Sequence, residues 1–217
     1  KCALPHFTTV VVFSATASTD ATWKATFEEF DKMGIAWVHF TSLIDEETKE
    51  HHLHQWFRVF DRTHDESADP APRRKRVAGT PFQPEKSEKP RKFKERAPET
   101  IFVFDDFSIE LKDKWVAKLL KEHRHYYSKV IVSSQYLTDL RGLGPRGQID
   151  IWILFGRIDE DIIEQIAKTV GMRAPLLQKL YEFATKKQFN FLYLDFGEKD
   201  IRVNFDQQIN KKILKVE

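Results

Sequence analysis

The sequence predicts an α/β protein in which a mostly parallel sheet is flanked by helices and a β-hairpin follows towards the C-terminal end. Over the first sixty residues, short uncharged runs rich in β-branched and aromatic residues alternate with segments of helical period, in the β-α-β-α order typical of parallel sheets. The run 100–104 carries no charge, as expected for an interior strand covered on both faces. Phe189, Phe191 and Tyr193 occupy every second position ahead of Gly197, which predicts the hairpin.

The composition is that of a globular protein of one or two domains. The apolar content is 41% over 217 residues, with 18 phenylalanines, which is ample for a sizeable core. Cys2 is the single cysteine, which excludes an internal disulfide and a multi-cysteine zinc site. The net charge of +2 is too balanced to indicate nucleic-acid binding by itself. No run of 18 apolar residues and no signal-peptide pattern occurs, so we expect no membrane span.

Residues 1–60 make the first part of the predicted core. One strand is expected over 8–13 and another over 35–40. Between them, Asp20 suits the N-cap of a helix and Gly34 suits its end. Asp45 is predicted to cap a second helix that begins directly after it. The apolar positions that these two helices would bury are Trp23, Phe27, Phe30, Leu53, Trp56, Phe57 and Phe60.

Residues 61–99 differ in character, because prolines, lysines and arginines dominate and aliphatic residues are almost lacking. Such a segment buries too little apolar surface to fold as a core, so we predict a basic, proline-rich insertion or linker. Within it, Arg73, Arg74, Lys75 and Arg76 are candidates for contacts with DNA phosphates or for a nuclear import signal. The alternative is a linker that only increases solubility.

Residues 100–185 are predicted to hold the second part of the core, and its first strand ends in Asp105 and Asp106. Carboxylates at the carboxyl end of an interior strand lie where α/β sheets bind ligands, and nucleotide hydrolases hold Mg²⁺ and position water there, at the Walker B site. After an amphipathic helix, the strand at 129–132 ends in Ser133, Ser134 and Gln135. If the two strands are neighbours, these polar groups would lie beside the carboxylates. The alternative is that all are ordinary turn and cap residues.

The rest of the chain continues the same alternation. Three glycines punctuate the loop that carries Arg141 and Arg146, and the run from Ile149 is predicted as a further interior strand of the same sheet. A helix ending at Gly171 and another over 174–185 follow. Residues 186–217 hold the hairpin and a lysine-rich tail.

Histidines cluster at two places along the chain, and each cluster is a candidate metal site. His51 and His54 share one helix face, but no recognised ligand motif supplies the remaining zinc ligands. We therefore interpret them as members of a solvated helix, and His52, His123 and His125 in the same way.

Taken in order, these motifs resemble the poxvirus-type genome-packaging ATPases of large DNA viruses, within the FtsK/HerA class of P-loop motors. The resemblance covers roughly residues 9–170. Asp105 and Asp106 match the Walker B pair of that family, and Gln135 matches its sensor glutamine. Arg124 and His125 match its RH, and the segment 13–18, FSATAS, is similar to its "SPT" strand end.

The resemblance implies an additional-strand P-loop fold and an ATPase that moves double-stranded DNA into capsids, with ATP and Mg²⁺ as cofactors. Asp105 would hold Mg²⁺ through water and, with Ser134, belong to the ATP site. Asp106 would position the attacking water, and Gln135 would sense the γ-phosphate. Arg146 or Arg141 would act as an arginine finger across the interface of a homo-oligomeric ring. The expected partners are capsid portal or vertex proteins, and the expected location is a viral assembly site in the host cytoplasm or nucleus, or the virion.

One feature of that family does not occur in these 217 residues, namely the phosphate-binding motif GxxxxGK[ST]. Gly142 and Gly147 have its spacing, but Gln148 and Ile149 stand where Lys and Ser or Thr are required. Because the chain opens at Lys1 without a methionine, we expect the motif upstream. Two alternatives remain: a non-catalytic structural or DNA-tethering protein on the same fold, and a P-loop kinase or helicase accessory domain.

Overall fold

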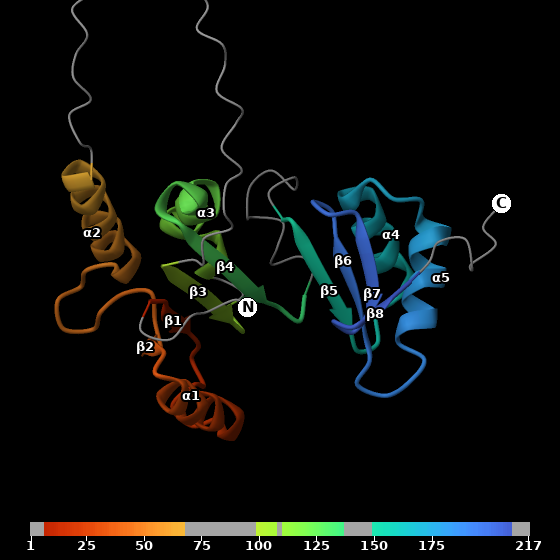
Figure 1. Cartoon of the computed structure of the whole chain (residues 1–217), viewed down its shortest axis with the longest axis horizontal. Helices are drawn as coiled ribbons and strands as arrows, with labels where there is room; N and C mark the ends of the chain where they lie inside the picture. The colour runs from red at the N-terminus through yellow and green to blue at the C-terminus, as the bar shows by residue number, and fades with distance from the viewer. Residues whose placement is uncertain (1–6, 68–98, 108–109, 137–148, 210–217) are drawn as a thin grey trace, which may run out of the picture. The chain divides into compact units, whose positions relative to one another are not determined.

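The computed structural model describes residues 7–67, 99–107, 110–136 and 149–209, and the side chains of 62–67 are left aside. The chain divides into two compact units, Lys1–Leu140 and Arg141–Glu217 (Figure 1). The second predicted core part, residues 100–185, therefore contributes to both units. Among the described helices, none has the length and apolar character needed to cross a membrane.

The first unit contains a parallel sheet of four strands in the order β2-β1-β3-β4. These strands are β1 (Thr9–Phe13), β2 (Ala36–Phe40), β3 (Thr100–Asp105) and β4 (Ser128–Ser133). The prediction that the strand of Asp105 is interior is confirmed, because β3 pairs with β1 on one side and β4 on the other. Phe13 is in register with Phe104, and Asp105 with Ser133, so the carboxyl ends of these strands meet at one edge.

The helix after β1 begins and ends as predicted. Helix α1 spans Ala21–Met33, and the Asp20 carboxylate accepts hydrogen bonds from the backbone N–H groups of its first turn. Gly34 ends the helix in the left-handed conformation, at φ 66°, which glycine adopts without a Cβ clash.

The second helix differs from the prediction. Helix α2 spans His52–Ser67 and is not capped by Asp45. The Asp45 carboxylate instead accepts hydrogen bonds from the backbone N–H groups of Glu47 (3.0 Å) and Thr48 (2.7 Å). These bonds close a separate turn, and an isolated bridge between Ile44 and His51 then leads the chain into α2. The prediction that Asp45 caps this helix is therefore wrong, because its carboxylate binds the N–H groups of a preceding turn.

The segment between β3 and β4 is also interrupted. A short 3₁₀ turn, η1 (Glu110–Lys112), precedes helix α3 (Lys114–Glu122), and a second one, η2 (His123–Tyr126), follows it. The helix restarts at Lys114 because the Asp113 carboxylate accepts a hydrogen bond from the backbone N–H of Trp115 at 2.6 Å.

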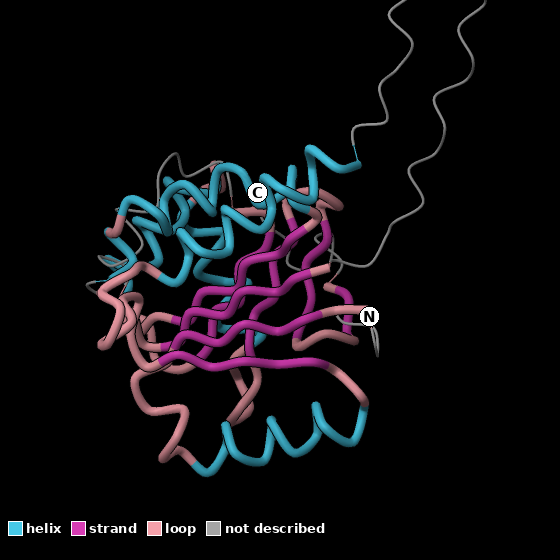
Figure 2. Tube along the Cα trace, turned by 90° about the vertical axis from the view of Figure 1, so that its left-hand side faces the viewer, coloured by secondary structure: helices cyan, strands magenta, loops and turns pink. Residues whose placement is uncertain are grey.

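Helices cover the two faces of the parallel sheet unequally. On one face, α1 packs its buried Phe27 against Val10, Val12 and Ile101, and Figure 2 shows this helix below the strands of the parallel sheet. On the other face, aromatic side chains of α2 lie edge-on to Phe102, which is fully buried. Because helices cover both faces of β1, every position from 10 to 13 is buried, which explains why all four residues are apolar.

The second unit contains an antiparallel sheet in the order β5-β6-β7-β8. Its strands are β5 (Ile151–Phe155), β6 (Phe191–Asp195), β7 (Asp200–Val203) and β8 (Gln207–Gln208). Helices α4 (Glu160–Val170) and α5 (Ala174–Ala184) lie on one face of this sheet (Figure 1). The predicted hairpin is confirmed as β6 and β7, and Gly171 ends α4 in the left-handed conformation as predicted.

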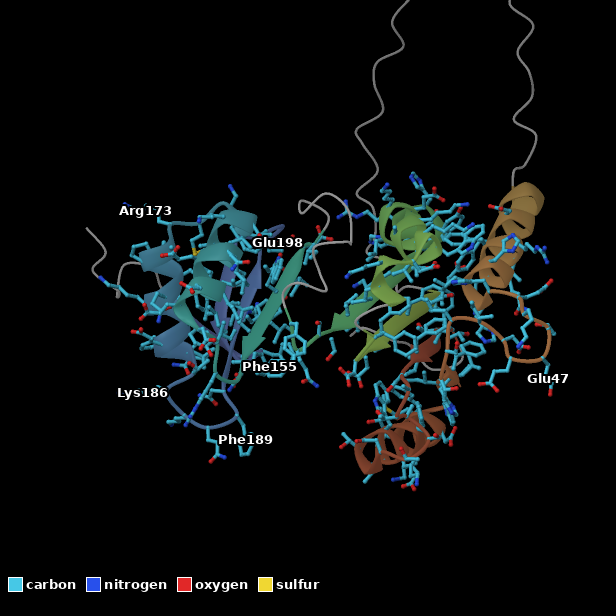
Figure 3. The ribbon with its side chains drawn as sticks, turned by 180° about the vertical axis from the view of Figure 1, so that it is seen from behind. Glu47, Phe155, Arg173, Lys186, Phe189 and Glu198 are labelled. Carbon is cyan, nitrogen blue, oxygen red and sulfur yellow. The ribbon has the colours of Figure 1, made fainter. Side chains whose placement is uncertain are left out.

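The prediction of an interior strand from Ile149 in the parallel sheet is wrong. This strand is β5, an edge strand paired antiparallel with β6, and not an interior strand of the parallel sheet. Only its alternate residues are buried, since Ile151, Ile153 and Phe155 are 44%, 41% and 64% exposed. Figure 3 shows Phe155 at the end of this strand. An unbroken apolar run usually marks burial on both faces, and here that rule failed.

Candidate functional site

Polar side chains from neighbouring strands lie together at the carboxyl edge of the parallel sheet. Asp105 ends β3 and Asp106 follows it, while Ser133 ends β4 and precedes Ser134 and Gln135. The Gln135 Nε2 points to the Asp106 Oδ1 at 3.5 Å, a long contact at the limit of hydrogen bonding. The structure thus brings together the carboxylates and the glutamine that sequence reasoning placed on neighbouring strands.

The backbone of Asp106 has an uncommon conformation. Its φ is 56°, in the left-handed region, which few residues other than glycine adopt, although aspartate tolerates it better than most. Immediately beyond it, Phe107 is only 3% exposed and anchors the chain in the core. The turn leaves Asp106 exposed while Asp105 stays half-buried. Two adjacent carboxylates therefore meet different environments.

A tryptophan from α1 holds the carboxylate of Asp105. The Trp23 indole Nε1–H donates a hydrogen bond of 2.8 Å to the Asp105 Oδ2. Trp23 lies in the first turn of α1, where the Asp20 cap binds its backbone N–H. Sequence reasoning assigned Trp23 only to the apolar stripe of the helix. Trp23 and Asp105 are 82 positions apart, and no sequence motif links residues at that distance. The indole N–H was the one feature of Trp23 that indicated a possible hydrogen-bond donor.

The end of β1 adds small polar groups to the same edge. Ser14 lies one position beyond the pair Phe13–Phe104 and is fully buried. Its Oγ is 3.4 Å from the Thr16 Oγ1, and its backbone N–H donates to the Phe40 carbonyl at 3.0 Å. The FSAT segment therefore makes a compact turn beside β3.

Ser134 has a local role. Its Oγ donates to the Tyr136 carbonyl at 2.9 Å and accepts from the Tyr136 backbone N–H at 3.2 Å. Such a serine turn stabilises the chain after β4. Next to it, the side chain of Gln135 contacts Asp106.

The donor set at this edge fits Mg²⁺. The cation prefers hard oxygen ligands and usually takes one or two carboxylates, with phosphate and water supplying the rest. Asp105 offers its Oδ1, for which no hydrogen bond is found within the described residues, and exposed Asp106 offers a second carboxylate. A dedicated cage is not formed, because no three His, Cys, Asp or Glu side chains converge to hold a metal anywhere in the described ranges.

Several predicted site residues are not placed at this edge. Arg124 and His125 lie exposed in η2, which leads to the amino end of β4, at the opposite edge of the sheet. Arg141 and Arg146 lie outside the described residues, as do Arg73, Arg74, Lys75 and Arg76 with most of the basic insertion.

The three histidines at the start of α2 pack against aromatic and acidic neighbours. The His52 ring stacks on Phe40 and the His54 ring on Trp115, with centroids 3.9 and 4.6 Å apart. The His51 Nε2 is 3.2 Å from the Asp113 Oδ1, close enough for an ion pair when protonated, but outside hydrogen-bond alignment. Burial lowers the pKa of His51 and of His52, and nearby carboxylates only partly oppose this.

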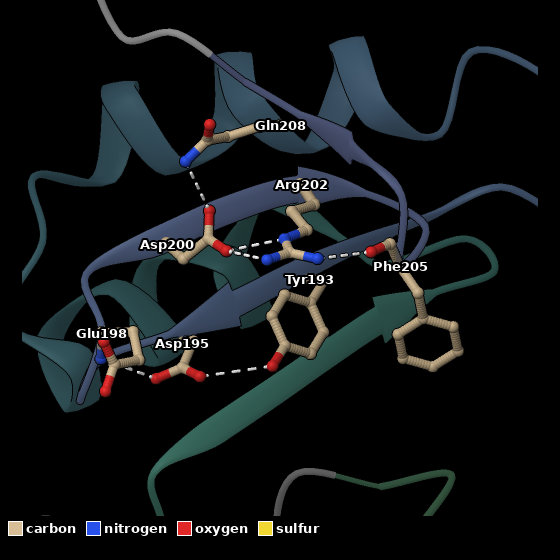
Figure 4. A pocket seen from close by; sticks show the side chains of 7 residues that line it. All are labelled: Tyr193, Asp195, Glu198, Asp200, Arg202, Phe205 and Gln208. Atoms are coloured by element: carbon tan, nitrogen blue, oxygen red, sulfur yellow. Dashed lines mark hydrogen bonds and ion pairs between the residues drawn. The ribbon is translucent and has the colours of Figure 1, made fainter. Parts of the chain in front are cut away.

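The second unit has a shallow pocket on the open face of its sheet, near the hairpin (Figure 4). Its polar groups satisfy one another. Arg202 donates to the Asp200 carboxylate from Nε (2.6 Å) and Nη2 (2.5 Å), and Gln208 donates to the same carboxylate at 3.0 Å. The bond from Arg202 holds the pKa of Asp200 below its usual range. Asp195 likewise accepts from the backbone N–H of Glu198 at 2.9 Å. This network braces β6, β7 and β8.

Comparison of the sequence with protein-family models gives no match, and neither does comparison with curated proteins. The residues of the sheet edge and the motifs quoted above are the features that indicate a function.

Proposed function

We propose that this chain is the ATPase core of an ATP-driven DNA translocase that packages a viral genome into capsids. The observation that carries the enzymatic part is the contact between Asp106 and Gln135 at the carboxyl edge, beside the half-buried Asp105. Hydrolysis of a nucleotide needs a fixed acceptor for the attacking water and a polar group that responds to the γ-phosphate. The pair from β3 and β4 supplies one group of each kind.

The roles follow from the environments of the side chains. Asp106 is exposed and acceptor-only when ionised, so it suits the orientation of a water molecule. Gln135 contacts that carboxylate through its amide nitrogen and keeps its amide oxygen for a water or a phosphate-bound group. Asp105, held through one oxygen, suits a magnesium ligand through the other. When bound, Mg²⁺ would neutralise charge on the β- and γ-phosphates.

The open side of β4 is consistent with this proposal. Within the described strands, β4 pairs only with β3, so its outer edge can accept a further strand. A strand that carries a phosphate-binding loop would, if paired there, bring the phosphates of a bound nucleotide close to Gln135. In that arrangement β3 and β4 would both be interior.

The DNA-moving part of the proposal is supported by the resemblance and by the basic insertion. Arg73, Arg74, Lys75 and Arg76 suit contacts with DNA phosphates, which are nearly independent of sequence and strongly dependent on salt. A ring of copies would let Arg141 or Arg146 reach a neighbouring nucleotide site.

The test is ATP turnover by the full-length protein. Asp106→Asn should lower kcat by about 100-fold or more while ATP affinity stays within about threefold, because water positioning acts in the transition state. Asp159→Asn is the matched control, since this N-cap aspartate makes no side-chain capping bond. Equal losses of binding and turnover would show a structural carboxylate. Unchanged turnover would contradict the proposal.

A second candidate is a non-catalytic structural or DNA-tethering protein. It is favoured by the local use of the Ser134 hydroxyl and by the lack of GxxxxGK[ST] in these 217 residues. The same protein would then bind DNA without hydrolysing ATP, and Asp106→Asn would leave DNA affinity unchanged.

A further inference from the structure

We infer that Trp23 is a positioning residue for the proposed hydrolysis site: its indole N–H fixes the carboxylate of Asp105 so that the second oxygen faces the site. The inference rests on the proposed function. Its direct support is the 2.8 Å bond from Nε1 to Oδ2, which spans from α1 to the end of β3. Because Trp23 is half-buried, little water competes for this bond.

The position of Trp23 is itself fixed by its neighbours. Its ring stacks on Phe27, with centroids 5.5 Å apart, and Phe27 stacks in turn on Trp37 at 4.1 Å. The Asp20 cap holds the backbone N–H of Trp23 at 3.0 Å. A donor held at both its ring and its backbone loses little conformational entropy when it binds a carboxylate. Trp23 is therefore suited to restrict Asp105 to one rotamer.

The same aromatic stack contains a natural control. On the other side of Phe27, the Trp37 indole N–H donates to the Asp31 Oδ1, also at 2.8 Å. Asp31 lies near the end of α1, is exposed, and is not at the carboxyl edge of the sheet. Trp37→Phe thus removes the same kind of bond from the same stack without touching Asp105. A purely structural role predicts equal effects of Trp23→Phe and Trp37→Phe.

The first experiment asks whether the bond exists in solution. The five tryptophans give five ¹⁵N-indole signals, and the signals lost in Trp23→Phe and in Trp37→Phe are those of Trp23 and Trp37. Asp105→Ala should shift the Trp23 signal and leave that of Trp37 in place, whereas Asp31→Ala should do the reverse. A Trp23 signal that ignores Asp105→Ala would overturn the inference.

The second experiment measures the consequence with Mn²⁺ as the probe, added alone to the full chain. Neighbours that orient a ligand typically change metal affinity by about tenfold or more, so Trp23→Phe should weaken Mn²⁺ binding roughly tenfold. Trp37→Phe should leave the affinity within about twofold, and the spectrum of free Mn²⁺ gives both values. Equal losses in the two variants would overturn the positioning role.

The two ideas fail in different ways. If the Asp105→Ala variant binds Mn²⁺ as tightly as the unaltered chain does, the metal role of Asp105 in the proposed function is contradicted. The indole signals then decide alone whether Trp23 fixes Asp105. If Mn²⁺ binding depends on Asp105 and not on the Trp23 indole, the site stands and the inference falls.

Discussion

The two sheets of this protein carry similar polar residues and use them differently. In the antiparallel sheet, Asp200 is held by two nitrogens of Arg202 and by Gln208, so its charge is compensated within the hairpin. In the parallel sheet, Asp105 has one indole donor and Asp106 has one long contact from Gln135. Cross-strand neighbours can pair directly along a hairpin, whereas parallel strands deliver their ends to a common edge. Compensated carboxylates stabilise a fold, and less compensated ones remain available for a ligand.

The largest expected effect separates two glutamines, one from each sheet. Gln135→Ala should lower kcat for ATP by about 100-fold, because a group that acts in the transition state is lost. Gln208→Ala should leave kcat unchanged, since that amide bonds Asp200 in the hairpin network. Steady-state turnover by the full-length protein gives both values. Loss of kcat in both variants would remove the distinction between the sheets.

Next in size is the effect of Arg202→Met on stability. Asp200 keeps only 13% of its side-chain exposure, so removal of its charged partner leaves a poorly solvated carboxylate. Because Arg202 is 40% exposed, solvent screening keeps the expected loss in unfolding free energy well below that of a buried ion pair. Urea unfolding measures it. An unchanged urea midpoint would show that the network is an incidental surface feature.

Replacing the glycine that ends a helix should have a smaller effect on stability, and the effect should be equal in the two units. Gly34 ends α1 at φ 66° and Gly171 ends α4 at φ 68°. Alanine at either position must adopt the left-handed conformation, which costs about 1 kcal/mol. For Gly171 the space around an added Cβ is open, so the cost there is purely conformational. Thermal unfolding of Gly34→Ala and Gly171→Ala should agree within about 0.5 kcal/mol. A clear difference would point to packing at Gly34.

The smallest effect is the pH dependence from the first unit. Burial lowers the pKa of His51 and of His52 below the ordinary value of 6.5. The unfolded chain therefore takes up protons below about pH 6.5 that the folded chain does not, and the free energy of unfolding falls as the pH decreases through this range. Above about pH 6.5, the two histidines make their full contribution to the free energy of unfolding. Urea midpoints between about pH 7.5 and 5.5 should show this slope, and His51→Gln with His52→Gln should flatten it. An unchanged slope would assign the effect to other groups.

Sequence reasoning succeeded where local rules and sheet topology agree. The uncharged run 100–104 identified the interior strand, and Asp20 with Gly34 identified the ends of α1. It failed where a local pattern has two solutions. Asp45 closes a turn as readily as it begins a helix, and an unbroken apolar run can still bury only one face, as in β5.

The candidate site shows the same division. Because β3 and β4 are neighbours, their polar ends meet, and this was foreseeable from the β-α-β order. The bond between Trp23 and Asp105 was not, since it depends on how α1 lies across the sheet. Tertiary contacts between residues 82 positions apart leave no mark in periodicity or spacing.

The most direct test of the central claim is a double-mutant cycle on ATP hydrolysis, with Asp106→Asn, Gln135→Ala and both together. If the two side chains act as one hydrolytic unit, each single change should lower kcat by about 100-fold and the double change should cost little more than the worse single. The turnover rates of the unaltered protein and the three variants, each at full length, decide this. Multiplied losses would mean that the residues act independently, and wild-type turnover in the double variant would contradict the claim that this sheet edge hydrolyses ATP.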